Sequence, residues 1–254
     1  MLNRLLLALV LISLLLGSSI TFAKQTLKIG VGNFPPYFIE KEQGGLFIEI
    51  TQALFNELPE YDISFVFMSN NRLHHEINTG KMIDVACNIF AESKVNAFLS
   101  APIFRYSDVA VSRKSDHLTI NQLSDLQGKS ITAYQGAMNL LGADYKAMAT
   151  TNPKYSEHPR PSYSSYLLIA GQKEVRIGDI NIFWYDLANK YQKIDEKINT
   201  QDYTVHHLWP DMYSHIAFKD ENIRDAINKA ITKLDHDGSI QKIYDKYRFI
   251  NYNQ

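Results

Sequence analysis

Segments with the alternation of β-strands and segments with the periodicity of helices follow one another along most of this chain. In the first half, strands are predicted at 26–31, 62–68 and 83–89, with helices at 47–58 and 72–79 between them. Consecutive strands separated by a helix are joined by crossovers, and crossovers connect parallel strands. The first half therefore predicts an α/β unit in which helices cover a parallel sheet.

The same alternation restarts in the second half. The predicted strands are 107–112, 130–134, 180–184 and 213–218, the predicted helices are 137–149, 163–172, 221–235 and 239–247, and a loop is predicted at 150–161. Two α/β units in series predict two lobes with a cleft between them, where a ligand would bind.

The composition is that of a folded globular protein. Of the 254 residues, 45% are hydrophobic and 21% are charged, and the formal net charge is −1. A balanced charge gives no basis for binding to nucleic acid. The single cysteine, Cys87, cannot form an internal disulfide, and we expect it to be a small buried hydrophobe on a strand.

The N-terminus has the order of features of a secretory signal. Arg4 is followed by an apolar run from Leu5 to Leu16 and by small residues that end at Ala23. The run is shorter than the ~20 residues that span a bilayer, which argues against the alternative of an uncleaved membrane anchor. We predict a signal peptide at 1–23, cleavage after Ala23, and a mature periplasmic protein.

Six short stretches follow this signal in a fixed order. They are Phe34-Pro35-Pro36-Tyr37, Gly-Leu-Phe-Ile-Glu-Ile at 45–50, Ile-Asn-Thr-Gly-Lys-Met-Ile-Asp at 77–84, Leu-Ser-Ala-Pro at 99–102, Leu-Ser-Asp-Leu-Gln-Gly-Lys at 123–129 and Leu-Asp-His-Asp-Gly-Ser-Ile-Gln-Lys-Ile-Tyr at 234–244. In this order, and over nearly all of the mature chain, they resemble the bacterial extracellular solute-binding proteins of family 3. Members of that family are periplasmic receptors of amino-acid ABC importers.

The resemblance implies the two-lobed α/β fold of type II periplasmic binding proteins, in which the chain crosses between the lobes twice. The crossings are expected at Ser112–Asp116 and at Trp209–Tyr213. Lobe 1 would then be discontinuous and comprise 24–112 and 213–254, with lobe 2 at 113–212. Two hinge strands allow such lobes to close over a solute.

The function implied is that of a monomeric receptor without catalytic residues, metal or cofactor. It would capture a small polar solute, either an amino acid or a related organic acid or amine, for a membrane ABC permease. Two alternatives remain open. One is an exported enzyme resembling the dehydratases of cyclic acids, for which Glu92 and Lys94 are the candidate acid–base pair. The other is a solute-sensing subunit of a membrane signalling receptor.

Three aromatic residues are candidates for contact with the solute. Phe34 and Tyr37 flank two prolines that stiffen their loop, and in the family an aromatic ring here lies against the ligand. Either ring could instead pack on its own lobe, and we expect at least one to face the cleft. Phe90 ends an apolar strand, where open α/β sheets place ligands, although packing in the core is the alternative for it.

A candidate anion site lies where a predicted strand meets a predicted helix, at Gln135, Gly136 and Ala137. Unpaired backbone N–H groups at a helix N-terminus can bind a carboxylate or phosphate. The family usually has hydroxyl residues after this glycine, which the chain lacks. We therefore predict an anion site formed by the backbone alone.

The arginine with which family members grip an α-carboxylate is missing. Its position falls on Ser93, so Lys94 is the nearest candidate cation, and Arg72 or Arg105 could supply a guanidinium instead. A lysine offers a point charge without the planar fork.

The acid that binds the α-amino group is displaced in the same reading. The family often has an aspartate five residues after the aspartate at the head of a Gly-x-x-Asp strand. Counting from Asp179 reaches Trp184, and Asp186 lies two residues further on. We name Trp184 and Asp186 as candidate ligand contacts, and an α-amino acid is one of several solutes that this pattern allows.

Two adjacent histidine pairs, His74-His75 and His206-His207, lack the i, i+4 spacing that places two rings on one helix face. We predict no metal site from them.

Overall fold

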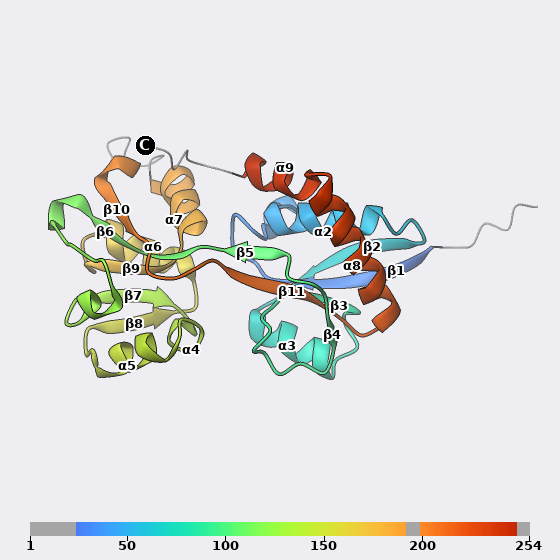
Figure 1. Ribbon diagram of the computed structural model, residues 1–254, viewed down its shortest axis with the longest axis horizontal. Coiled ribbons are helices and arrows are strands. Elements are labelled where there is room, and N and C mark those ends of the chain that lie inside the picture. Colours follow the sequence, from blue (N-terminus) through green and yellow to red (C-terminus); the bar gives the residue numbers. More distant parts are fainter. Residues whose placement is uncertain (1–23, 192–198, 248–254) are drawn as a thin grey trace, which may run out of the picture.

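The computed structural model describes residues 24–191 and 199–247. The predicted signal peptide, with its cleavage site at Ala23, lies outside them. The described chain forms two lobes, each built around one mixed β-sheet with helices on both faces, and two strands run between the lobes (Figure 1). Within the described residues no helix is long and apolar enough to cross a membrane.

Lobe 1 contains the first sheet. Its strands lie in the order β2 (Tyr61–Phe67), β1 (Gln25–Val31), β3 (Val85–Ile89), β11 (Met212–Phe218) and β4 (Phe98–Leu99), and β5 (Phe104–Tyr106) pairs with β11. β1 is parallel to β2 and β3, whereas β11 runs antiparallel to β3. Helices α2 (Leu46–Asn56), α8 (Glu221–His236) and α9 (Ser239–Lys246) cover one face, and α3 (Asn70–Asn78) covers the other.

Lobe 2 contains the second sheet. Its strands lie in the order β10 (Tyr203–His206), β6 (Asp108–Arg113), β9 (Val175–Asp179), β7 (Ile131–Tyr134) and β8 (Tyr155–His158). β7 is parallel to β8 and β9, and β6 is antiparallel to β9 and β10. Helices α4 (Ala137–Leu140) and α5 (Ala143–Thr151) pack on one face, and α6 (Pro161–Ile169) and α7 (Ile180–Asp186) pack on the other.

The strand predicted at 180–184 is a helix. Its apolar residues Ile180, Phe183, Trp184 and Leu187 are all buried in one cluster, and their spacing of three and four is that of a helix face. Asp179 begins the helix, because its carboxylate accepts a hydrogen bond from the Ile182 N–H. The strand of this region is β9, and it ends where the predicted strand was expected to begin.

Two further predictions for lobe 2 were wrong. The helix predicted at 137–149 is divided into α4 and α5 by Gly142, whose φ of 96° is a left-handed conformation that a helix interior does not contain. The predicted loop 150–161 contains β8, which pairs only with β7 and so forms an edge of the sheet. An edge strand has little apolar alternation to reveal it.

The first crossing between the lobes lies at Ser107, before the stretch Ser112–Asp116 where it was expected. β5 ends at Tyr106 in the sheet of lobe 1, and β6 begins at Asp108 in the sheet of lobe 2. The chain returns between β10 and β11, through 207–211. The Ser107 hydroxyl donates a hydrogen bond to Asp211, which ties the two crossing segments together. We therefore propose lobe boundaries at Ser107 and at 207–211.

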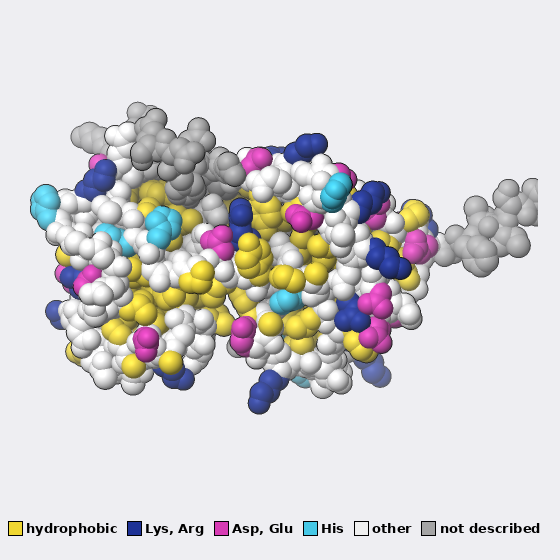
Figure 2. Space-filling model, in the orientation of Figure 1, with side chains coloured by type: hydrophobic (Ala, Val, Ile, Leu, Met, Phe, Trp, Pro, Cys, Tyr) yellow, Lys and Arg dark blue, Asp and Glu magenta, His cyan; other side chains and the backbone are white. Residues whose placement is uncertain are grey.

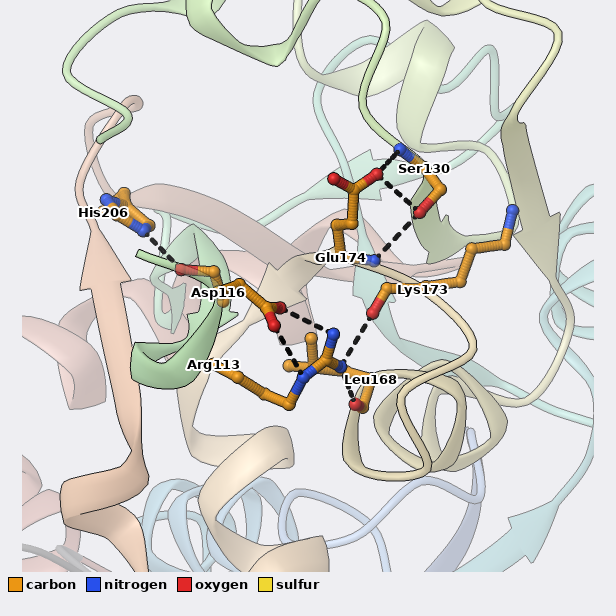
Figure 3. Close-up of polar contacts among 8 residues, drawn as sticks. Arg113, Asp116, Ser130, Leu168, Lys173, Glu174 and His206 are labelled. Atoms are coloured by element: carbon orange, nitrogen blue, oxygen red, sulfur yellow. Dashed lines mark hydrogen bonds and ion pairs between the residues drawn. The ribbon is translucent and has the colours of Figure 1, made fainter. Parts of the chain in front are cut away.

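The end of β6 that is far from lobe 1 is held by Arg113 (Figure 3). Its guanidinium donates to the carbonyl oxygens of Leu168 and Lys173, and it forms an ion pair with Asp116 at 2.6 Å. These contacts tie β6 to the turn that leads from α6 into β9.

At the same end of the sheet, the residue before β9 is bonded to the residue before β7 (Figure 3). Glu174 Oε2 accepts hydrogen bonds from the Ser130 N–H at 2.7 Å and the Ser130 hydroxyl at 2.9 Å. These contacts fix β6, β9 and β7 to one another at the strand ends that are far from lobe 1. The opposite ends of β6 and β9 carry Asp108 and Asp179 toward lobe 1.

Candidate functional site

A cavity of about 130 Å³ lies between the lobes and receives side chains from both. Phe34, Asn70, Asn88, Phe90 and Tyr106 line it from lobe 1, and Asp108, Tyr134, Gln135, Arg176, Asp179 and Ile182 line it from lobe 2. A wider cleft of about 750 Å³ adjoins the cavity and shares some of its lining residues, among them Phe34, Asn70, Tyr134 and Gln135. In the space-filling view the molecule is notched between its two lobes, with hydrophobic side chains on both sides (Figure 2).

Two of the three predicted aromatic residues line the cavity. Phe34 lines both the cavity and the wider cleft, and the Phe90 ring lies 5.7 Å from the Tyr106 ring at the cavity wall. Both rings are only partly buried, which leaves one surface of each for a ligand.

Tyr37 takes the alternative that the sequence left open for it, packing on its own lobe. Its ring is fully buried and stacks on Phe47 with 4.2 Å between ring centroids. Only the hydroxyl approaches lobe 2, where it accepts a hydrogen bond from the Asn181 side chain at 3.1 Å. Burial, and next the charge of Asp179, raise the pKa of Tyr37, so the hydroxyl stays neutral.

Three charged side chains that line the cavity come from the paired strands β6 and β9. Asp108, Arg176 and Asp179 are 3%, 1% and 3% exposed. Asp108 and Asp179 stand opposite each other in the antiparallel ladder, which places their side chains on the same face of the sheet. Charged groups are rarely buried so completely unless they pair or bind a ligand, so this cluster marks the site.

The hydrogen bonds of the two acids differ. Asp179 uses both carboxylate oxygens, since Oδ2 accepts from the Ser107 N–H at 2.9 Å and Oδ1 from the Ile182 N–H at 3.1 Å. Asp108 Oδ2 accepts from the Tyr134 hydroxyl at 2.8 Å, and its Oδ1 has no hydrogen-bond partner among the described residues. Burial, and next the charge of Asp179, raise the pKa of Asp108 to about 7.

Arg176 is the one cationic residue among those described at the cavity wall. Its Nη1 donates to the Asp179 carbonyl at 3.2 Å, its guanidinium lies 5.4 Å from the Phe183 ring, and its Nε is buried without a partner. Gly178 leaves room for this arrangement, because a Cβ there would stand 3.5 Å from the guanidinium nitrogens and 3.2 Å from the Tyr134 ring.

The structure provides another starting point for the family spacing. β9 begins at Val175, so the residue at the head of this strand is Glu174, which follows Gly171 by three residues. Glu174 is a glutamate where the family pattern has an aspartate. Five residues after Glu174 is Asp179, which lines the cavity, whereas the count from Asp179 reaches Trp184 on α7.

Trp184 and Asp186 lie on α7, away from the small cavity. Trp184 is 4% exposed and belongs to the core of lobe 2. Asp186 lines only the wider cleft, where it accepts a hydrogen bond from Ser165 and forms an ion pair with Lys190 at 2.7 Å. Its charge is thus already compensated within the protein.

The predicted backbone anion site is occupied by the protein itself. The N–H groups of Gly136 and Met138 donate to the two carboxylate oxygens of Glu157 at 2.7 and 2.8 Å. Gln135 and Gly136 still line the clefts, whereas Ala137 is fully buried in the core. Glu157 lies on β8, in a segment that the sequence suggested was a loop, so nothing in the pattern announced this contact.

The first-lobe cations predicted from the sequence do not line the cavity or the cleft. Lys94 is exposed, and Arg72 is 54% exposed and pairs with Glu76 at 3.8 Å on the same helix. Arg105 lies 3.9 Å from Asp211 at the hinge. The cation at the cavity is instead Arg176 of lobe 2, which the sequence analysis did not name.

Asn88 is a second residue that the sequence analysis missed. It lies within β3 with a φ of 66°, where the pairing with β11 shifts register between Ala86 and Ile89, and its Oδ1 accepts hydrogen bonds from the Tyr106 and Ser214 hydroxyls at 2.7 and 2.9 Å. Its amide nitrogen is left to donate toward the cavity that it lines. A signal was present for these residues: a charged or amide side chain inside an apolar strand must find a partner.

Two other predictions concern chemistry that the site does not use. Cys87 is fully buried on β3, as predicted, and burial raises its pKa to about 12, so the thiol is unreactive. In the part of the chain that the structure describes, no cluster of three or more potential ligands could hold a metal ion.

The chain belongs to the bacterial extracellular solute-binding proteins, family 3, whose model matches residues 27–250. The resemblance and the fold predicted from the sequence are thereby confirmed. The family is one of solute-binding proteins, so the chain is a solute receptor and not an enzyme.

Individual relatives are distant. The chain is 27% identical to the L-cystine-binding protein TcyJ of Bacillus subtilis over 91% of its length and 86% of the relative's, and 23% identical to an arginine-binding periplasmic protein of Mannheimia haemolytica over 93% and 97%. The fold matches a substrate-binding protein of an ABC uptake transporter from Streptococcus pneumoniae with bound histidine, with a TM-score of 0.67, 20% identity and coverage of 88% and 92%.

Proposed function

We propose that the protein is the periplasmic receptor of an ABC importer for an amino acid or a close amine-bearing relative of one. In this proposal residues 1–23 direct export and are removed after Ala23, and the mature monomer delivers its solute to a membrane permease. The relatives named for cystine, arginine and histidine support an amino acid as the class of solute.

The observation that carries the proposal is the buried cluster of opposite charges in a cavity between the lobes. Asp108 and Asp179 supply acceptors suited to an ammonium group, and Arg176 supplies donors suited to a carboxylate. An amino acid presents both groups within a few ångströms of each other. Because the cluster is removed from water, each contact with the solute is stronger than it would be at the surface.

Lobe 1 completes the site with rings and amides. Phe34 and Phe90 offer apolar surface, and Asn88 offers an amide donor. A solute held by lobe 2 alone would leave these groups in water. Closure of the lobes about Ser107 and 207–211 would bury them against the solute, and this differential contact drives closure.

The test is a binding screen on the protein beginning at Lys24. The twenty protein amino acids, L-cystine, putrescine and a set of organic acids are compared by thermal shift, and each hit is measured by titration calorimetry. A ligand at 100 times its Kd stabilises by about 2.7 kcal/mol, which a melting curve resolves. Binding of an organic acid without an amino group, and of no amino acid or amine, would contradict the proposal.

The site assignment has its own control. Phe98 is 40% exposed on β4 and does not line either cleft, so Phe98→Ala is matched to Phe34→Ala. We expect only Phe34→Ala to weaken the binding found in the screen. Equal effects of both variants would remove the ligand from this cavity while leaving the family function in place.

A further inference from the structure

Two buried acids are paired at the cavity, and Arg176 is the one cationic residue among the described residues that line it. Asp108 opens β6 and Asp179 ends β9, and they are direct partners in the ladder. Neither forms an ion pair with any residue that the structure describes, and Arg176 donates to the Asp179 carbonyl oxygen rather than to a carboxylate. The pair therefore has acceptor capacity, namely Asp108 Oδ1, that no described protein group uses.

Two carboxylates that share a buried site repel each other, so one of them holds a proton more readily than an isolated acid does. Burial raises the pKa of Asp179 as well, but the N–H groups of Ser107 and Ile182 and the Tyr37 hydroxyl oppose this rise. Asp108 receives only the Tyr134 hydroxyl. The proton that the pair retains near neutral pH consequently resides on Asp108.

Titratable and charged groups face Asp108 from three strands and one helix. Asp179 and Arg176 face it from β9, Tyr134 from β7, Tyr106 from β5 and Tyr145 from α5. Burial raises the pKa values of the three tyrosines, so they remain neutral over the physiological range. Among these groups, Asp108 is the one whose pKa lies near neutral pH, at about 7.

We propose that Asp108 adds a second carboxylate beside Asp179, where the family spacing places the amine-binding acid, and that Asp108 releases its proton to the solvent when the solute's ammonium group binds. The inference rests on the proposed function and assigns to the solute a primary ammonium group that lies between two carboxylates. An ammonium ion has three donors, and the free Asp108 Oδ1 accepts one of them once it is deprotonated. The incoming positive charge favours the ionised form of Asp108.

The consequence is binding that depends on pH in a defined direction. Below the pKa of Asp108, which burial and the neighbouring Asp179 raise to about 7, the ammonium must displace a proton. Apparent affinity then falls up to tenfold for each pH unit below this value and is constant well above it. Between pH 8.5 and pH 5 we expect a weakening of about 100-fold.

The experiment measures protons released on binding. The probe is the tightest binder among the twenty protein amino acids, L-cystine and putrescine, titrated at pH 6 in two buffers with different ionisation enthalpies. We expect release of about 0.9 proton per ligand at pH 6 and nearly none at pH 8.5. Binding without proton release at pH 6 overturns the proposal and leaves the proposed function intact, whereas a protein that binds no member of the panel overturns both.

Asp108→Asn identifies the residue that releases the proton. The amide keeps the acceptor for Tyr134 and cannot titrate, so proton release should disappear and affinity should vary less than threefold between pH 5.5 and 8. Glu92→Gln, an exposed acid on the loop after β3, is the matched control and should behave as the unaltered protein. Equal proton release in Asp108→Asn would overturn the assignment.

A ligand-free measurement covers the case in which Asp108→Asn does not fold. Carbon-13 NMR of aspartate carboxyl groups in the empty protein should show one carboxyl that titrates near neutral pH, whose signal shifts on addition of the probe. Titration of every aspartate below pH 5 would overturn the proposal without any variant.

Discussion

The two lobes contribute different chemistry to the same cavity. Every charged side chain on the wall of the small cavity, namely Asp108, Arg176 and Asp179, comes from lobe 2, whereas lobe 1 contributes the rings of Phe34 and Phe90 and two amides. The interaction of a buried charge of lobe 2 with a charge on the solute is strengthened because water is excluded. We therefore expect lobe 2 to bind the charged groups of the solute and lobe 1 to contact its apolar part.

The largest effect should come from removing the charge of Asp179. We expect Asp179→Asn to weaken binding by more than 100-fold, since breaking one side of a buried charge contact costs on the order of 3 kcal/mol. The measurement is titration calorimetry, with circular dichroism to verify the fold. Asp186→Asn is the matched control, because Asp186 is equally buried in lobe 2 and is already paired with Lys190. Similar losses from both would refute the special role of Asp179.

The second prediction concerns the stability of the empty protein. The pKa of Asp108 is raised by folding from 3.8 to about 7, so its contribution is present below pH 3.8 and is lost as pH rises through 7. Relative to the unaltered protein, Asp108→Asn should therefore gain free energy of unfolding from pH 5 to pH 8, by about 3 kcal/mol. Urea denaturation at both pH values measures it, and parallel pH profiles would contradict the burial of an ionising Asp108.

The third prediction addresses the apolar side of the comparison. Phe34→Ala should weaken binding about tenfold, because losing part of an aromatic contact costs about 1.5 kcal/mol. The heat-capacity change of binding should become less negative, while the pH dependence of binding stays the same. A change in pH dependence would show that lobe 1 also contributes to the charged interactions, and would contradict the proposed division between the lobes.

The smallest effects are expected at the exposed cations of lobe 1. Lys94→Ala and Arg72→Ala should each change affinity less than twofold, since exposed charges contribute little and neither residue lines the cavity or the cleft. The same calorimetric titrations measure both. A loss of tenfold or more from either would restore a carboxylate-binding cation to lobe 1.

Part of the site was predictable from the local pattern. Phe34 follows a strand with clear alternation and Phe90 follows a mostly apolar strand, so both could be placed beyond the carboxyl ends of strands. Tyr37 could not be assigned in the same way, because which of two nearby rings enters the core depends on Phe47, ten residues further along the chain.

The wrong assignment of 180–184 as a strand also affected the candidate site, because the five-residue family spacing was then counted from Asp179. The apolar residues of α7 form a short run, and a short run does not distinguish a strand from a helix. Once β9 ends at Asp179, the same spacing selects Asp179 without further information.

The amino-acid sequence by itself determined the alternation of strands and helices, the two-lobed fold and the membership in a family of solute receptors, because these depend on periodicity and on short motifs along the chain. The tertiary structure alone decided that Glu157 fills the backbone N–H groups at Gly136 and that Asp108 faces Asp179. Asp108 and Asp179 are 71 residues apart and become neighbours only through the register of β6 and β9. Their shared burial, which no local pattern records, is what makes them a site.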